Sequence, residues 1–323
     1  LPELVFAAAP NTRPADVEIL RRHGVEPAGL PRIRLICHED EIQQKYDALE
    51  RDFAAYPGAL PVEVFPLRLS LGQLGMRGIE ALLGVPPNRV PEYLQALTAC
   101  VKHLGADLTC AALREELCGV RHLDRTAQAR IDARLALVTG LEDRRADLWN
   151  IVEPGVLTII DLSGRWLRRQ DVFPLVAALL NVLCERSPRH GALQRLIAFD
   201  EVNRLARDPV LWEHLVMVAR QARHQGLTLW FSGQDLLTVP DALLGVATQV
   251  LCFRQANPKV FGDVKRRVSG YARTSYNDAS ALLPGQALWT AAVASDPALC
   301  GAVHRVQFRP AACAHGGHTR VVF

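Results

Sequence analysis

Lysine is scarce in this sequence: only four of the 37 basic residues are lysine, and the others are arginine. None of the four lysines stands in a Gly-x-x-x-x-Gly-Lys-Ser/Thr context, so the printed residues contain no loop of the kind that cradles nucleotide phosphates. The formal net charge of +3 is too small to indicate nucleic-acid binding by itself. The arginine excess alone therefore identifies no partner.

Two further absences bear on where the protein works. The sequence has no run of eighteen apolar residues and no signal-like N-terminus, which argues against a transmembrane helix and against secretion. The eight cysteines are scattered without a Cys-x-x-Cys pair, and several fall inside apolar runs, which favours buried reduced thiols over disulfides or zinc sites. We therefore expect a soluble cytoplasmic protein that does not contact a membrane.

The order of apolar patterns predicts an α/β fold with a mainly parallel sheet, antiparallel edge strands and a helical insertion. The 323 residues are enough for about two domains, and 49% hydrophobic with 22% charged residues is an ordinary globular composition. The expected parts are a first part of the core at 1–84, a helical insertion at 85–150, a second part of the core at 151–310 and a tail at 311–323.

Apolar periodicity also predicts individual elements. Strands are expected at 33–37, 62–65, 156–163, 196–199, 227–232, 249–253, 286–293 and 302–308. Helices are expected at 15–23, 41–55, 91–104, 110–118, 124–140, 171–185, 209–226 and 258–268. Asp124, Asp208 and Asn257 are the predicted N-caps of three of these helices, because capping residues precede the first helical turn.

Two acidic residues, Asp200 and Glu201, follow directly after the apolar run 196–199. A continuous apolar run is typical of a strand buried on both faces of a parallel sheet. The ligand site of an open α/β sheet lies off the carboxyl ends of its strands, so Asp200 is placed to hold Mg²⁺ and Glu201 to orient an attacking water. A strand that ends at a helix N-cap with an acidic first turn is the alternative interpretation.

Two further apolar runs also end in polar residues. The run 227–232 leads into Ser232-Gly233-Gln234, and the run 249–253 is followed by Arg254. Three successive strands would thus deliver carboxylates, an amide and a guanidinium at their carboxyl ends. We expect these groups to lie at one edge of the sheet.

These motifs together resemble the C-terminal half of a HerA-type ATPase, in the HerA/FtsK branch of hexameric DNA-pumping motors. The resemblance extends from about residue 154 to residue 317. It is carried by residues 196–201, 219–226, 232–234 and 251–254 and, less diagnostically, by 308–310 and 315–317. It implies a RecA-like P-loop ATPase core that uses ATP and Mg²⁺, forms a homo-hexamer and translocates double-stranded DNA. A nuclease of the NurA kind is the implied partner, in end resection, repair or phage defence.

The resemblance also implies roles for single residues. The groups expected at the nucleotide and its hydrolysis are Asp200, Glu201, Ser232, Gln234, Arg254 and His315. Arg254 is the better candidate for a group that completes a neighbouring subunit's site, because it ends a strand. Arg220 and Arg223 are further candidates, since they fall roughly opposite the apolar stripe of their helix. In a monomer these two arginines would simply be solvated.

A basic loop is expected after the strand 156–163. Residues 165–169 carry three arginines around one tryptophan, and a motor that threads DNA needs basic loops to grip phosphates. We expect Arg165, Arg168 and Arg169 to contact DNA, with Lys265 on the helix 258–268 as a further contact. A solvated turn and a solvated helix face are the alternatives.

The missing phosphate loop separates the possible functions. Because the sequence opens with Leu1-Pro2 instead of methionine, we expect a truncated or fragmentary chain in preference to a degenerate relative that hydrolyses nothing. ATPase activity would then depend on a phosphate loop outside the printed residues. The alternatives are a conjugation- or segregation-type DNA pump of the same superfamily and a non-hydrolysing scaffold subunit.

Overall fold

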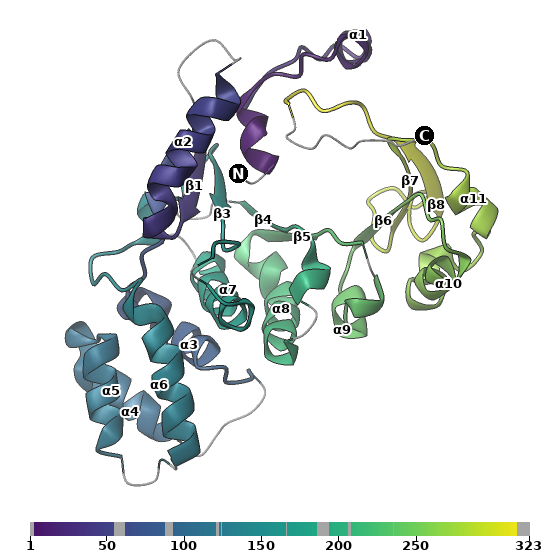
Figure 1. The fold of residues 1–323 in the computed structure, drawn as a ribbon. Coiled ribbons are helices and arrows are strands. Elements are labelled where there is room, and N and C mark those ends of the chain that lie inside the picture. The colour runs from purple at the N-terminus through teal and green to yellow at the C-terminus, as the bar shows by residue number, and fades with distance from the viewer. Residues whose placement is uncertain are drawn as a thin grey trace. The chain divides into compact units, whose positions relative to one another are not determined.

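The computed structural model describes residues 3–54, 62–87, 93–120, 123, 125–165, 167–185, 194–205, 208–234 and 236–314. The chain divides into two compact units, which are residues 1–193 together with 311–323, and residues 194–310. Each unit has its own strands and helices (Figure 1). The α/β class and the combination of parallel and antiparallel strands expected from the sequence are confirmed.

The first unit is built on a three-stranded parallel sheet in the order β2-β1-β3. Its strands are β1 (Ile33–Cys37), β2 (Val62–Pro66) and β3 (Leu157–Ile160). Because β1 is central and covered on both faces, each of its residues is buried. Alternate side chains enter different cores: Ile33 and Leu35 pack with residues of α2 (Ile42–Phe53), whereas Ile36 packs with the helical part of the unit.

Five helices form that helical part. They are α3 (Leu71–Leu82), α4 (Leu94–Leu104), α5 (Cys110–Cys118), α6 (Arg125–Thr139) and α7 (Arg169–Cys184). All but α3 were predicted, within a few residues at each end. The expected cap Asp124 of α6 lies outside the described residues.

The sequence analysis missed α3 because glycine lowers helix propensity and this helix contains three glycines. Gly75 has φ of 60° and breaks the helical geometry at that point. Gly78 sits close to α7, since a Cβ there would lie 3.7 Å from the carbonyl oxygen of Ala178. Tertiary packing against α7 therefore stabilises a helix that local propensity disfavours.

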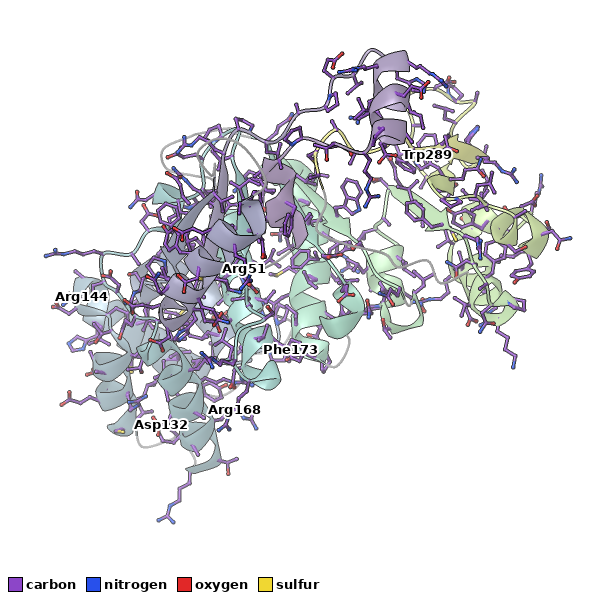
Figure 2. All side chains as sticks on the ribbon, turned by 45° about the horizontal axis from the view of Figure 1, so that its top comes forward. Arg51, Asp132, Arg144, Arg168, Phe173 and Trp289 are labelled. Atoms are coloured by element: carbon purple, nitrogen blue, oxygen red, sulfur yellow. The ribbon has the colours of Figure 1, made fainter. Side chains whose placement is uncertain are left out.

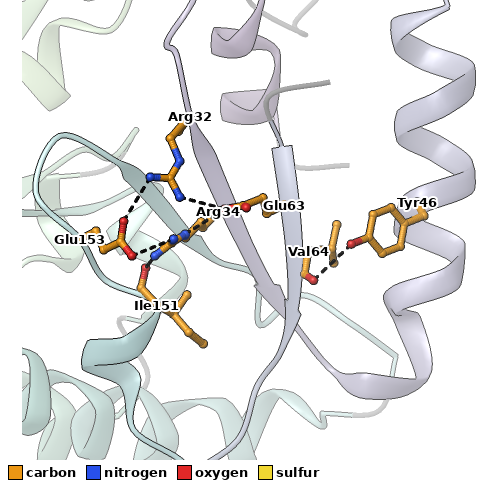
Figure 3. A network of polar contacts seen from close by, with 7 residues as sticks. All are labelled: Arg32, Arg34, Tyr46, Glu63, Val64, Ile151 and Glu153. Atoms are coloured by element: carbon orange, nitrogen blue, oxygen red, sulfur yellow. Dashed lines mark hydrogen bonds and ion pairs between the residues drawn. The ribbon is translucent and has the colours of Figure 1, made fainter. Parts of the chain in front are cut away.

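An ion-pair network ties together β1, β2 and the segment before β3 (Figure 3). Arg34 lies 3.0 Å from Glu63 and 2.9 Å from Glu153, and its side chain is only 7% exposed. Arg32 pairs with the same two acids from the solvent side. Arg34 also donates to the carbonyl oxygen of Ile151. The network lies toward the amino ends of the strands.

The chain's C-terminal segment returns to the first unit. Asn11 N donates to the carbonyl oxygen of Ala312 at 3.0 Å, and Pro10 pairs with Cys313 in an antiparallel bridge. The short helix α1 (Pro14–Arg22) follows this contact. Residues from the two ends of the sequence are therefore joined within one unit.

The second unit opens with the parallel pair β4 (Arg195–Phe199) and β5 (Leu227–Phe231), joined through α8 (Pro209–Gln221). Asp208 caps α8 as predicted, accepting from Leu211 N at 3.0 Å. After one 3-10 turn, Gly226 adopts φ of 62° and ends the helical segment, as expected.

One face of the β4–β5 pair is open. Leu196 and Trp230 are 58% and 54% exposed, and Ala198 and Thr228 on the same face are exposed too. Within the second unit, the expectation that β4 is buried on both faces is therefore not met. Within this unit α8 lies on one side of the two strands, so only that face is covered (Figure 1).

The rest of the second unit is a three-stranded antiparallel sheet, β6 (Gln249–Phe253), β7 (Gln286–Ala291) and β8 (Val303–Gln307). The predicted antiparallel strands β7 and β8 are confirmed. The helices here are α9 (Asp241–Leu244), α10 (Pro258–Arg267) and α11 (Tyr276–Ser280). Asn257 caps α10 as predicted, accepting from Lys259 N at 2.9 Å. Across the described parts of both units, no helix has the length and apolar character needed to cross a membrane.

Candidate functional site

The carboxyl ends of β4 and β5 meet through a short hydrogen bond. The Ser232 hydroxyl donates to Asp200 Oδ1 at 2.6 Å, and the same oxygen accepts from Glu201 N at 3.0 Å. The backbone pairing continues past the strands, because Ser232 N donates to the carbonyl oxygen of Phe199 at 2.9 Å. Direct parallel pairing of the two strands thus brings these polar ends together, as expected from the sequence.

Glu201 has φ of 49°, and it is the one residue other than glycine with positive φ among those that the structure describes. The left-handed region costs a residue with a Cβ about 1 kcal/mol or more. In this conformation Glu201 Oε1 lies 3.4 Å from Gln234 Nε2. A strained backbone conformation of this kind persists where the surrounding structure enforces it, and such conformations cluster at functional sites.

Asn203 belongs to the same group and was missed by the sequence analysis. Its Oδ1 accepts from Gln234 N at 3.4 Å. A Cβ at Gly233 would lie 3.2 Å from that oxygen and 3.3 Å from Val202 Cγ1, so glycine lets the two loops approach. The sequence feature that could have indicated Asn203 is its side-chain amide, two residues after the Asp200-Glu201 pair. Its partner comes from a loop about thirty residues later, which no local pattern reveals.

The two carboxylates fit the needs of a magnesium site. Asp200 Oδ1 is occupied by two donors, and within the described parts of the chain no hydrogen bond reaches Asp200 Oδ2. No cluster of three or more His, Cys, Asp or Glu side chains occurs among the described residues. Mg²⁺ typically takes one or two carboxylates and completes its shell with water and substrate phosphates, so Asp200 and Glu201 are the residues that would hold it.

A phosphate cradle has no counterpart among these groups. Lys45, in the first unit, is already paired with Asp161 at 2.7 Å. The group at the ends of β4 and β5 therefore offers carboxylates, an amide and a hydroxyl, and the printed residues contain no Gly-x-x-x-x-Gly-Lys-Ser/Thr motif.

Arg254 is not joined to the acidic group. It is exposed immediately after β6, and β6 pairs with β7 in an antiparallel sheet separate from β4–β5. In the described part of the second unit, no hydrogen bond or ion pair links Arg254 to Asp200 or Glu201. We expected the polar ends of all three strands to lie at one edge of a sheet, and this is met for β4 and β5 but not for β6.

The remaining candidate residues are dispersed. Arg220 is exposed in the last turn of α8. Arg165 and Arg168 are exposed in the segment between β3 and α7, and Lys265 is half-buried in the last turn of α10 (Figure 2 labels Arg168). His315 and the side chains of Arg169 and Arg223 lie outside the described residues. The roles given to all these residues stay predictions.

No family model matches this sequence, and no curated protein matches it either. Similar solved structures include the bacterial conjugative coupling protein TrwBdeltaN70 in its unbound monoclinic form, with 12% identity, a TM-score of 0.48 and coverage of 88% of this chain and 87% of that one. VirB4 of Thermoanaerobacter pseudethanolicus is 14% identical, with a TM-score of 0.48 and coverage of 91% and 84%. B204, the DNA-packaging ATPase from Sulfolobus Turreted Icosahedral Virus, is 12% identical, with a TM-score of 0.39 and coverage of 86% and 98%. At such low identities and TM-scores, function has to be argued from the geometry of the site.

Proposed function

We propose that this chain is part of an ATP-driven motor that translocates double-stranded DNA, with a RecA-like core of the HerA/FtsK kind. The observation that carries the proposal is the group formed by Asp200, Glu201, Ser232 and Gln234. Two acids and an amide from adjacent parallel strands converge there, and one of the acids is held in a strained backbone conformation. Such an arrangement suits a site that positions a metal and a water.

In this proposal each residue has one task. Asp200 would hold Mg²⁺ or a water of its shell, while the hydrogen bond from Ser232 fixes Asp200 Oδ1. Glu201 accepts a proton from, or orients, the attacking water, and the contact with Gln234 keeps its carboxylate in place. When bound, Mg²⁺-ATP supplies a polarised γ-phosphate at this edge of β4 and β5. ATP hydrolysis also needs a phosphate loop, and the printed residues contain no such motif.

Coupling to DNA would involve the polar ends of other elements. Gln234 sits on the β5 loop, whose backbone is tied to Asn203, so a change at Glu201 can reach that loop. Arg165, Arg168, Arg169 and Lys265 would contact DNA phosphates. Arg254 would act on a neighbouring subunit of a homo-hexamer, with Arg220, Arg223 and His315 near the same interface.

The partner decides the biological role. A nuclease of the NurA kind would make the motor part of end resection, repair or defence. A conjugation-type pump of the same superfamily is the alternative, in which the motor moves DNA between cells.

The decisive experiment compares DNA-stimulated ATP hydrolysis by the natural full-length gene product and by Glu201→Gln. We expect the substitution to abolish turnover, because the amide cannot take a proton, while nucleotide binding is retained. Glu115→Gln is the matched control, since Glu115 is exposed on α5. Equal turnover in Glu201→Gln and wild type would contradict the catalytic assignment.

A non-hydrolysing scaffold subunit is the second candidate, and the missing phosphate-loop motif favours it. It predicts a natural product without a Gly-x-x-x-x-Gly-Lys motif that neither binds nor hydrolyses ATP. Mass and N-terminal sequence of the natural product, taken with its ATP binding, distinguish the two.

A further inference from the structure

Three charged side chains are buried together in the first unit. Lys45 Nζ lies 2.7 Å from Asp161 Oδ2 and 3.9 Å from Glu41 Oε2. The Lys45 side chain is 15% exposed, and the two acidic side chains are each 5% exposed. Asp161 directly follows β3, and its backbone N donates to the carbonyl oxygen of Ile36 at 2.8 Å. The cluster therefore lies at the carboxyl ends of β1 and β3.

The residues after Asp161 are bound to this cluster by their backbone. Ser163 N and its hydroxyl donate to Asp161 Oδ1 at 3.0 and 2.6 Å, and Arg165 N donates to Glu41 Oε1 at 3.1 Å. A Cβ at Gly164 would lie 2.3 Å from Glu41 Oε1, so only glycine allows the approach. Residues 161–165, which we call the 161–165 turn, are thus fixed to β3 and to the start of α2.

Stability alone is a poor explanation for burying these charges. Removing a charged pair from water costs about as much as the pair regains, and apolar residues of the same volume often serve equally well. Burial by itself would raise the pKa of Asp161, but the hydrogen bonds from Lys45 and Ser163 together outweigh it and lower that pKa. A charged cluster tied together by hydrogen bonds does hold its neighbours in one arrangement.

We propose that Lys45, Asp161 and Glu41 are positioning residues that hold the 161–165 turn, so that Arg165 is presented to DNA phosphates in a preformed position, with Arg168 at the start of α7 as a second contact. This inference rests on the proposed DNA-translocating function. Both arginines are exposed, and they flank the position where the turn leads into α7. A preformed loop binds more tightly than one that must be ordered on binding, because the entropy of ordering is lost before DNA arrives.

The turn can be tested in the full chain without DNA. Trypsin cleaves after arginine, so the release of peptides ending at Arg165 or Arg168 reports how often the turn opens. We expect Gly164→Ala to raise that rate about ten-fold, because its methyl group displaces the Glu41 carboxylate from Arg165 N. Gly140→Ala is the matched control, since a Cβ there meets no atom within 4 Å.

Glu41 separates hydrogen bonding from packing. Glu41→Gln keeps an acceptor for Arg165 N, whereas Glu41→Ala removes it. We expect Glu41→Ala to accelerate cleavage as Gly164→Ala does, and Glu41→Gln to keep the wild-type rate. Thermal unfolding of every variant establishes that folded proteins are compared. Wild-type cleavage in Gly164→Ala would overturn the proposal, whatever the result with DNA.

DNA affinity supplies the second readout, measured with a blunt double-stranded oligonucleotide at several salt concentrations. Arg168→Ala is expected to lower the salt slope of log Kd by about one, because one phosphate contact is lost. Gly164→Ala keeps both arginines, so we expect its Kd to rise about three- to ten-fold with an unchanged slope.

Failure of the DNA contact and failure of the positioning role give different results. Unchanged Kd and slope in both Arg165→Ala and Arg168→Ala would show that the loop does not contact DNA, and the positioning role would fall with the DNA contact. If the arginine variants behave as expected but Gly164→Ala binds with the wild-type Kd, the DNA contact stands and the positioning role is wrong.

Discussion

Ser232 and Asp200 join the ends of two parallel strands through a hydrogen bond of 2.6 Å between a hydroxyl and a carboxylate oxygen. The residues are far apart in sequence, and the pairing register of β4 and β5 brings them together, since Phe199 and Phe231 are opposite each other. The bond occupies Oδ1, so Oδ2 is the oxygen of Asp200 that would be available to a metal in the proposed site.

Ser232→Ala tests that relationship. The substitution leaves Asp200 without its hydroxyl donor, and a hydrogen bond to a charged group contributes about 1.5–3 kcal/mol, so we expect DNA-stimulated turnover to fall about ten-fold or more. The Mg²⁺ concentration needed for half-maximal rate should rise with it. Ser280→Ala is the control, since its hydroxyl donates to the carbonyl oxygen of Asn277 in α11. Unchanged rate and Mg²⁺ dependence would remove Ser232 from the site.

The backbone strain at Glu201 predicts that a glycine variant is more stable than an alanine variant at this position, the reverse of their order inside a helix. Glycine tolerates φ of 49° and alanine does not, so Glu201→Gly should be more stable to urea than Glu201→Ala by about 1 kcal/mol. At Glu115, in the interior of α5, the order should reverse, because glycine costs a helix about 1 kcal/mol relative to alanine. The same order at both positions would show that Glu201 carries no backbone strain.

Local rules predicted most elements of the second unit. Asp208-Pro209 and Asn257-Pro258 mark the starts of α8 and α10, and Gly226 marks the end of the segment after α8. In each case the capping residue or the glycine lies within a few residues of the helix end that it predicts. Local capping and backbone freedom therefore determine where these helices begin and end.

Long-range contacts account for what the sequence did not reveal. Asn203 belongs to the candidate site because it is hydrogen-bonded to Gln234. Lys45 belongs to the buried charged cluster because it is hydrogen-bonded to Asp161, which lies more than a hundred residues away. β6 was expected to add a parallel strand end, yet its pairing with β7 puts it in another sheet. No periodicity within a strand specifies its neighbour, so Arg254 could be placed at a strand end but not next to the acids.

The network around Arg34 predicts acid sensitivity. The hydrogen bond from Arg34 Nε lowers the pKa of Glu63 more than desolvation raises it, and a second hydrogen bond, from Arg34 Nη2, lowers the pKa of Glu153. A carboxylate whose folded pKa is depressed stabilises the fold fully above its unfolded value of about 4.3, and this contribution is lost as pH falls through the lower folded value.

Arg34→Met should therefore flatten the dependence of unfolding free energy on pH below about pH 4.3, besides lowering stability at neutral pH. Urea unfolding between pH 3 and pH 7 measures both effects. Arg51→Met is the control, because Arg51 is largely exposed and pairs with its sequence neighbour Asp52. A pH profile in Arg34→Met parallel to that of wild type would contradict the assigned cause.

Subunit mixing tests whether Arg254 serves a neighbouring site. In a head-to-tail ring, Glu201→Gln subunits still offer Arg254, and Arg254→Ala subunits still offer Glu201. Each variant alone is expected to be nearly inactive, because a group of this kind typically contributes 10³-fold or more to the rate. Random equal mixing should then restore activity at about one interface in four, since a complete site needs one subunit of each kind in the right order.

Arg273→Ala, at another exposed arginine of the second unit, should keep wild-type activity alone and so controls for loss of positive charge. No recovery on mixing, with ring assembly verified by light scattering, would show that Arg254 and Glu201 must belong to the same subunit.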